Sequence, residues 1–191
     1  MRNHLAPTLR RIRAVLIDVD GVLASRQITW AGQSEGRRLY EIKQFCVHDG
    51  AATWAAHAAG LVQAVLSGRD SAALRKRMER MRVDEVFAGD LNKLRALEIL
   101  KRKYRVSESE MAYIGDDFLD LPIMERVGLP IAVSDATPDV KRVARYVTKQ
   151  KGGEGAVAEV LRMILTAQGK WQRAIRQTVD QAYTPKKKER A

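Results

Sequence analysis

IRAVLIDVDGVL, residues 12–23, joins a short apolar run to two aspartates and a glycine. The run ends directly at Asp18, as a buried parallel strand does where it reaches a site. Three later apolar runs also end at small or acidic residues, at 61–66, 111–114 and 129–133. We interpret all four runs as strands of one parallel sheet.

Helix-like stretches separate these strands, at 51–59, 71–81, 91–104, 119–127 and 155–167. Strand and helix therefore alternate, which predicts an α/β fold of the Rossmann-like type, with a central parallel sheet between two helical layers. In such sheets ligands gather at the carboxyl ends of the strands. We expect Asp18, Ser67 and Asp116 to meet there.

Residues 24–42 do not follow this alternation. Gln27 to Trp30 and Arg37 to Ile42 flank the segment 31–36, which has the composition of a turn. We predict a β-hairpin flap directly after the first strand.

Length and charge limit the organisation of the chain. Its 191 residues, 46% of them hydrophobic, suit one well-cored domain, which we place at 1–170, followed by a basic C-terminal tail at 171–191. The net charge of +11 is concentrated at the two ends. Such runs are usually solvated, so we expect no nucleic-acid partner, although phosphate-backbone binding by the basic ends is the alternative.

Other sequence features bear on compartment and metal chemistry. No apolar run is long enough to span a membrane, and the basic N-terminus lacks the apolar stretch of a secretory signal. Cys46 is the single cysteine, which fits a reducing compartment. We therefore expect a cytoplasmic protein, and any metal should be held by carboxylates.

Asp18 and Asp20 lie two residues apart at a strand end, and Gly21 allows the chain to turn sharply around a ligand. One carboxylate can attack phosphorus to form an acyl phosphate, while the other protonates the leaving oxygen and then activates water. A solvated turn is the alternative for this motif taken alone.

Phosphoryl transfer also needs donors and positive charge around the phosphoryl oxygens. Ser67 and Gly68 offer a hydroxyl and accessible amides at a strand end, although Ser67 could equally be a helix N-cap. Lys93 near the start of a helix can neutralise the phosphoryl group, although an isolated lysine is normally a surface charge.

Asp116, Asp117 and Asp120 supply three acids at another strand end, where oxygen ligands of this kind suit Mg²⁺. Asp120 could also hold Lys93 in place. An acidic helix N-terminus explains one or two of these acids, but it does not explain their match with the motifs around Asp18 and Ser67.

These four motifs, in this order and spacing, resemble those of the haloacid-dehalogenase superfamily. The resemblance implies the three-layer fold of that superfamily, and the short intervals between the motifs leave no room for a cap domain. It implies that Asp18 is the nucleophile and Asp20 the general acid and base. It further implies phosphate binding by Ser67 and Lys93, Mg²⁺ binding by Asp18, Asp116 and the Asp20 backbone carbonyl, and support from Asp117 and Asp120.

A closer likeness over about residues 11–170 is to the 3-deoxy-D-manno-octulosonate 8-phosphate phosphatases, which make a lipopolysaccharide sugar. It rests on the hairpin and on the segments 47–50, 66–71, 112–117, 127–129, 132–136, 152–156 and 167–170. The likeness implies a phosphorylated sugar acid as substrate and a homotetramer in which a neighbour covers the open site. It also implies substrate contacts by His48, Asp49, Gly50, Gly68, Arg69 and Arg77.

Three positions depart from the pattern of that family. His48, Trp54 and Glu154 stand where the family usually has cations. An anionic sugar would lose charge-assisted hydrogen bonds there. Another sugar-acid or sugar phosphate, such as a nonulosonate 9-phosphate, is therefore the alternative substrate, and Trp54 could either stack on a sugar ring or pack between helices. A catalytically silent binding module with this fold is a further alternative.

Overall fold

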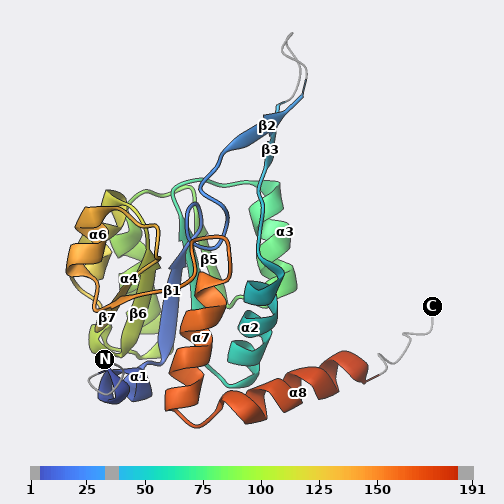
Figure 1. Ribbon diagram of the computed structural model, residues 1–191, viewed down its shortest axis with the longest axis vertical. Helices are drawn as coiled ribbons and strands as arrows, with labels where there is room; N and C mark the ends of the chain where they lie inside the picture. Colours follow the sequence, from blue (N-terminus) through green and yellow to red (C-terminus); the bar gives the residue numbers. More distant parts are fainter. Residues whose placement is uncertain (1–4, 33–38, 185–191) are drawn as a thin grey trace.

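The computed structural model describes residues 5–32 and 39–184 (Figure 1). Its centre is a parallel sheet of six strands in the order β5-β4-β1-β6-β7-β8. The strands are β1 Ala14–Asp18, β4 Val62–Ser67, β5 Glu85–Ala88, β6 Met111–Gly115, β7 Leu129–Ala132 and β8 Tyr146–Val147. The predicted α/β class and parallel sheet are confirmed.

β1 lies inside the sheet, between β4 and β6, and every one of its residues is buried. It pairs with β4 on one side, with Ala14 opposite Val62, and with β6 on the other side, with Ala14 opposite Met111. From β1 the chain continues to β4 and β5, and it then crosses to β6 on the opposite side. The loops after β1 and β6 therefore leave the sheet at its switch point, where ligands bind in open α/β sheets.

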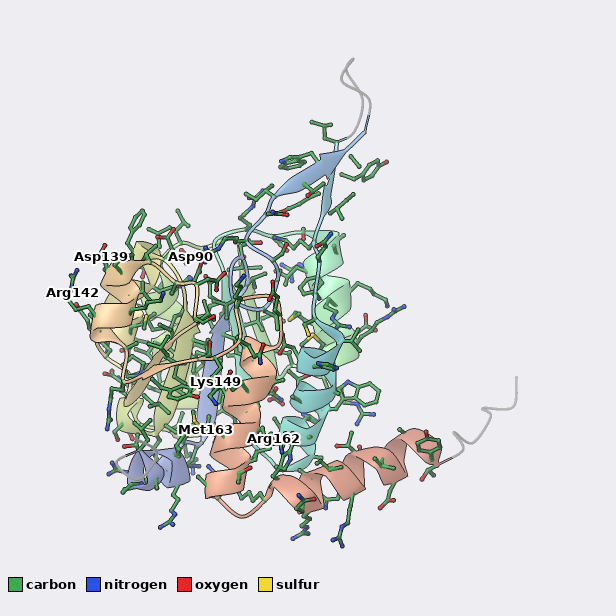
Figure 2. All side chains as sticks on the ribbon, in the orientation of Figure 1. Asp90, Asp139, Arg142, Lys149, Arg162 and Met163 are labelled. Carbon is green, nitrogen blue, oxygen red and sulfur yellow. The ribbon has the colours of Figure 1, made fainter. Side chains whose placement is uncertain are left out.

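The helices form two layers around the sheet (Figure 1). One layer consists of α1 Ala6–Arg11, α2 Val47–Ala58, α3 Ala72–Met81 and α7 Ala156–Ala167, and the other of α4 Lys93–Tyr104, α5 Leu121–Met124 and α6 Pro138–Val143. Short 3₁₀ turns at Glu108–Glu110 and Phe118–Asp120 precede β6 and α5. The outer faces are polar, as the ion pair between Asp139 and Arg142 on α6 illustrates (Figure 2).

A two-stranded hairpin projects beyond the carboxyl end of the sheet (Figure 1). It consists of β2 Thr29–Ala31 and β3 Tyr40–Ile42, which pair antiparallel. The predicted hairpin is therefore confirmed, while its turn at 33–38 lies outside the described residues. Within the described ranges, the segments between β1 and β4 and between β4 and α4 contain no cap domain, as predicted.

Residues 171–183, which the sequence analysis assigns to a basic tail, form α8, Trp171–Tyr183. This helix packs against α2 and α7, and it buries Ala174. The domain boundary at residue 170 stays a prediction, and residues 185–191 lie outside the described part of the chain. Over the described residues, no helix has both the length and the apolar character that a membrane crossing requires.

Candidate active site

The residues expected to meet at the carboxyl end of the sheet do meet there. Asp18 ends β1, Ser67 ends β4 and Asp116 directly follows β6. Carboxylate oxygens of Asp18, Asp116 and Asp120 all lie within 4.8 Å of one another. The parallel register brings these side chains together because neighbouring strands end at the same edge.

Lys93, the first residue of α4, lies between two of these carboxylates. Its Nζ is 2.8 Å from Asp18 Oδ1 and 2.5 Å from Asp120 Oδ1, and it donates to the Tyr113 hydroxyl at 2.9 Å. Burial alone would favour the neutral amine, but Asp18 and Asp120 together raise the pKa of Lys93. The predicted surface-charge alternative for Lys93 does not apply, because the side chain is 8% exposed.

Asp120 accepts hydrogen bonds from several members of this cluster. It is fully buried, and its Oδ1 accepts from the Tyr113 hydroxyl at 2.6 Å as well as from Lys93. Its Oδ2 accepts from the backbone N–H groups of Asp116 at 2.8 Å and Asp117 at 3.2 Å. Both oxygens are thus occupied by groups of the protein, and the supporting role of Asp120 stays a prediction.

Asp117 begins the 3₁₀ turn at 118–120. Its Oδ1 accepts from the Phe118 N–H at 2.6 Å, and it shares a capping box with Asp120. A capped turn fixes the path of the chain after β6. Asp117 therefore stabilises the loop that carries Asp116.

The two remaining carboxylates, Asp18 and Asp116, have high proton affinity. Burial, reinforced by Asp120, raises the pKa of Asp18 to about 7. Burial, reinforced by Asp18 and Asp120, likewise raises the pKa of Asp116 to about 7. A nearby divalent cation would offset this repulsion and favour both ionised forms.

The surroundings of Asp116 fit such a cation. Its Oδ1 is buried and has no hydrogen-bond partner among the described residues. A Cβ at Gly21, whose φ is +89°, would lie 2.1 Å from Asp116 Oδ2, so only glycine lets the loop after β1 pass so close. Carboxylate oxygens are the ligands that Mg²⁺ prefers. Asp18 and Asp116 are therefore the side chains that would hold the metal.

Ser67 is positioned as part of the site and does not cap a helix. It is 2% exposed, and its Oγ accepts from the Arg69 N–H at 3.1 Å. The N-cap of α3 is Ser71, which accepts from the Leu74 N–H at 3.2 Å. The N-cap alternative for Ser67 is therefore wrong for α3. A Cβ at Gly68 would lie 2.3 Å from Leu91 Cδ2, so the Leu91 side chain packs directly over this turn.

Two of the expected substrate-binding residues lie around the start of α2 and α3. Arg69 pairs with Glu41 of the hairpin at 3.4 Å, and its guanidinium carbon is 5.9 Å from the Trp30 ring centroid. Arg77 donates to the Cys46 carbonyl at 3.1 Å and fills the space beside Gly50. Arg69 thus lies between the sheet end and the hairpin, whereas Arg77 braces the start of α2.

His48 and Asp49 point in different directions. His48 is exposed on the first turn of α2. Asp49 has no exposed surface, and its Oδ1 accepts from the Ala158 N–H at 2.7 Å in the first turn of α7. Burial raises the pKa of Asp49 to about 6, although backbone N–H groups of α7 oppose this. Asp49 therefore joins α2 to α7 and offers no surface to a ligand in this conformation, contrary to the expected substrate contact.

Trp54 is used for helix packing. Its indole N–H donates to the Arg80 carbonyl at 2.6 Å, and Arg82 lies 4.6 Å from its ring centroid. Both partners belong to the far end of α3. Of the two alternatives for Trp54, helix packing is the one observed.

Sequence reasoning missed three polar residues of the site, Tyr113, Lys43 and Glu41. Tyr113 is fully buried and bonds Asp120 and Lys93. Its signal was a hydroxyl in an otherwise apolar strand, because a buried hydroxyl needs a partner. Glu41 lies in β3 of the hairpin, and Lys43 directly follows that strand. The Lys43 amine contacts Asp20 Oδ1 and lies 3.0 Å from Glu41 Oε1. No motif in the sequence around Lys43 and Glu41 predicts this contact.

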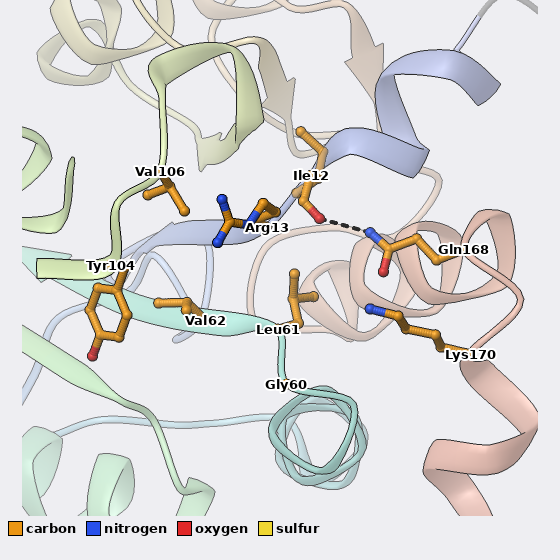
Figure 3. A pocket seen from close by; sticks show the side chains of 9 residues that line it. All are labelled: Ile12, Arg13, Gly60, Leu61, Val62, Tyr104, Val106, Gln168 and Lys170. Atoms are coloured by element: carbon orange, nitrogen blue, oxygen red, sulfur yellow. Dashed lines mark hydrogen bonds between the residues drawn. The ribbon is translucent and has the colours of Figure 1, made fainter.

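A separate pocket of about 230 Å³ lies at the opposite, amino end of the sheet (Figure 3). Gln168 is one of its lining residues and donates to the Ile12 carbonyl at 2.7 Å. None of the residues assigned to the site lines this pocket; its lining is Ile12, Arg13, Gly60, Leu61, Val62, Tyr104, Val106, Gln168 and Lys170. The acidic cluster lies at the other end of β1.

Comparison with known proteins finds relatives among the haloacid dehalogenase-like hydrolases. Residues 73–161 match the family model of haloacid dehalogenase-like hydrolases. The 3-deoxy-D-manno-octulosonate 8-phosphate phosphatase of Salmonella typhi is 36% identical over 93% of this chain and 92% of the relative. The enzyme of the same name from Escherichia coli strain K12 is 38% identical over 88% of this chain and 87% of the relative.

Solved structures agree with these matches. The phosphatase of that name from Moraxella catarrhalis, in complex with magnesium ion, phosphate ion and a KDO molecule, superposes with a TM-score of 0.84 and 34% identity, covering 92% of this chain and 98% of that one. The Yersinia pestis phosphatase gives a TM-score of 0.83 with 35% identity and covers 89% of each chain.

Proposed function

This chain belongs to the 3-deoxy-D-manno-octulosonate 8-phosphate phosphatases, a family of haloacid dehalogenase-like phosphomonoester hydrolases, and we propose that it hydrolyses that sugar-acid phosphate through an aspartyl-phosphate intermediate. The observation that carries the proposal is the ion pairing of one buried lysine, Lys93, with both Asp18 and Asp120 at the switch point of the sheet. This arrangement holds a carboxylate and a cation where a phosphoryl group would lie.

In the first half of the reaction, an oxygen of Asp18 bonds to phosphorus while the bond from phosphorus to the sugar oxygen breaks. Asp20 gives its proton to that leaving oxygen, so the sugar departs as an alcohol. In the second half, water attacks the phosphorus and Asp20 takes the proton of that water. The bond between Asp18 and phosphorus then breaks, which releases phosphate and restores both carboxyl groups.

Lys93 and Ser67 stabilise the phosphoryl oxygens during both halves. Lys93 stays protonated because its carboxylate partners outweigh the effect of burial, so it presents a positive charge to the phosphoryl group. The Ser67 hydroxyl and the backbone N–H groups at Gly68 are the neutral donors. Mg²⁺ held by Asp18, Asp116 and the Asp20 carbonyl would supply further positive charge to the developing transition state.

Recognition of the sugar acid depends on the mouth of the site. Arg69 offers a cation between the sheet end and the hairpin, where it could pair with a sugar carboxylate. Glu154 is exposed in the loop whose Gly153 N–H donates to the Val22 carbonyl, so it adds negative charge near the catalytic loop. This charge disfavours a sugar carboxylate at that position, so it favours, as the second candidate, a sugar phosphate that carries no carboxylate.

The remaining family properties complete the proposal. We expect Mg²⁺ as the cofactor, a homotetramer whose neighbouring subunits cover the open site, a cytoplasmic location and a role in lipopolysaccharide synthesis. The exposed apolar hairpin residues Trp30, Leu39 and Tyr40 support a covered site, because they would lose water contact at an interface.

The test is phosphate release from a panel of phosphate esters with Mg²⁺ and with EDTA. The panel contains 3-deoxy-D-manno-octulosonate 8-phosphate, a nonulosonate 9-phosphate and simple sugar phosphates. We expect strong preference for the octulosonate, loss of turnover in EDTA, and none with Asp18→Asn. Preference for another ester would reassign the substrate, and full activity of Asp18→Asn would refute the mechanism.

A further inference from the structure

A polar cluster connects the hairpin to the carboxylate that handles protons. We define it as Lys43, Glu41 and Arg69. The Lys43 amine contacts Asp20 Oδ1 and lies 3.0 Å from Glu41 Oε1. The same Glu41 oxygen is 3.4 Å from the Arg69 guanidinium. The cluster therefore runs from the mouth of the site to Asp20.

Lys43 is the unusual member of this cluster. Its side chain is only 3% exposed, whereas Trp30, Tyr40 and Ile42 of the same hairpin are largely exposed. Burial of an ammonium group is unfavourable unless carboxylates compensate it. Lys43 has two such partners, Asp20 and Glu41, so its amine is held from both sides at one position.

Asp20 itself is only partly enclosed. Its side chain is 29% exposed, and Lys43 contacts Oδ1. No hydrogen bond from another described side chain to Asp20 is observed. A carboxyl group anchored through one oxygen can rotate little, so its other oxygen stays available to exchange a proton with a bound ester or with water.

We propose that Lys43 is a positioning residue that orients Asp20 for proton transfer, and that Glu41 holds Lys43 in place. The inference rests on the proposed role of Asp20 as general acid and base. It makes the hairpin part of the proton-transfer apparatus of its own subunit, in addition to any role in covering the site.

Two other roles for Lys43 make different predictions. A purely structural lysine would stabilise the hairpin, and its loss would slow every reaction by the same factor whether or not Asp20 is intact. A lysine that binds the phosphoryl group directly would also act independently of Asp20. Only a residue that works through Asp20 loses its effect when Asp20 is already disabled.

The experiment is a double-mutant cycle in Mg²⁺ with the best substrate of the panel. Lys43→Met keeps the apolar stem and removes the charge. We expect it to lower kcat about 10²-fold, within the range of general acid–base effects, with a smaller change in KM. In an Asp20→Asn background the same substitution should change kcat less than about 2-fold. Lys76→Met is the control, because Lys76 is an exposed lysine that pairs with Glu79 on α3.

A second comparison uses p-nitrophenyl phosphate, whose leaving oxygen needs little protonation. Lys43→Met should slow this ester much less than the sugar ester, because Asp20 contributes little to its departure. Glu41→Gln should give a smaller loss with the same selectivity, and it serves as the test variant if Lys43→Met does not fold by circular dichroism.

Equal losses in the wild-type and Asp20→Asn backgrounds would overturn the inference, and so would an unchanged kcat. A wild-type protein that releases phosphate from none of the esters would instead refute the proposed function. The two failures are therefore distinguishable.

Discussion

The acidic cluster and the hairpin lie side by side at the same end of the molecule, but they are built in opposite ways. Asp120, Tyr113 and Lys93 are buried and bonded to one another by several contacts at once. In the hairpin, the side chains of Trp30 and Tyr40 are more than half exposed. The hairpin projects away from the body of the protein (Figure 2).

The difference separates two tasks. A buried and fully bonded cluster keeps its geometry whatever ester enters, because each group has only one low-energy position. The exposed side chains of the hairpin, unlike its buried Lys43 and Glu41, can change with little loss of stability, and they can therefore adapt to a sugar. The four variants below test whether chemistry and substrate choice separate in this way.

The largest effect is expected for Asp18→Asn. Removal of the nucleophile should lower kcat at least ~10³-fold, as losses of nucleophilic groups do in other hydrolases. Steady-state phosphate release measures the loss, and circular dichroism checks the fold. Asp139→Asn is the matched control because Asp139 is exposed on α6. Retained turnover would mean that another group attacks phosphorus.

Lys93→Met should affect both activity and stability. It leaves Asp18 and Asp120 buried without their shared cation, which should lower the free energy of unfolding by about 3 kcal/mol at pH 8. At pH 5 the cost should be smaller, because the raised pKa of Asp18 allows it to protonate. Urea denaturation at both pH values tests this, and Lys76→Met serves again as the control. A pH-independent cost would contradict the ion-pair explanation.

The metal-free protein should lose stability as pH rises from about 4 to 7. Burial and the neighbouring carboxylates raise the pKa of Asp116 from its ordinary value of 3.8 to about 7 in the folded protein, so the native state binds more protons than the unfolded state in this window. The free energy of unfolding should therefore fall with pH, on the order of 4 kcal/mol for this group, and level off above pH 7.

The control for this pH dependence is Asp116→Asn in EDTA, in which the fall should be smaller. Mg²⁺ added at pH 8 should raise the unfolding temperature of the wild type but not that of the variant. Equal responses of the two proteins would exclude Asp116 as a ligand.

The smallest effect is expected in the hairpin. Trp30→Ala should raise KM a few-fold and leave kcat within about 2-fold, because the ring lies at the mouth of the site and touches none of the reacting groups. The free energy of unfolding should change by less than about 0.5 kcal/mol. A large fall in kcat would show that the exposed residues of the hairpin and the acidic cluster are not separable in this way.

The parallel sheet and most of the candidate site could be predicted from the sequence. The run 12–17 is apolar on both faces, which is what a central parallel strand requires, and its end at Asp18 located the site. The spacing of the four motifs then brought Ser67, Lys93 and Asp116 to the same edge. Local patterns were sufficient because parallel strands align their ends.

Long-range contacts could not be predicted in the same way. Asp49 looks like a polar residue at a helix start, but its partner, the Ala158 N–H, is 109 residues away. Lys43 reaches Asp20 only because the hairpin returns to the sheet end. The helix at 171–183 was missed because its basic residues hide the apolar spacing of Trp171, Ile175 and Val179.

The loop at Gly152 and Gly153 packs closely against the loop that follows β1. A Cβ at Gly152 would lie 1.7 Å from the Gly21 carbonyl oxygen, and the Gly153 N–H donates to the Val22 carbonyl at 2.8 Å. The loop that follows the nucleophile is therefore supported by residues that the ribosome adds much later. At roughly 5–20 residues per second, on the order of ten seconds pass between the two segments. A nascent chain that already carries the nucleophile thus still lacks the support for its catalytic loop.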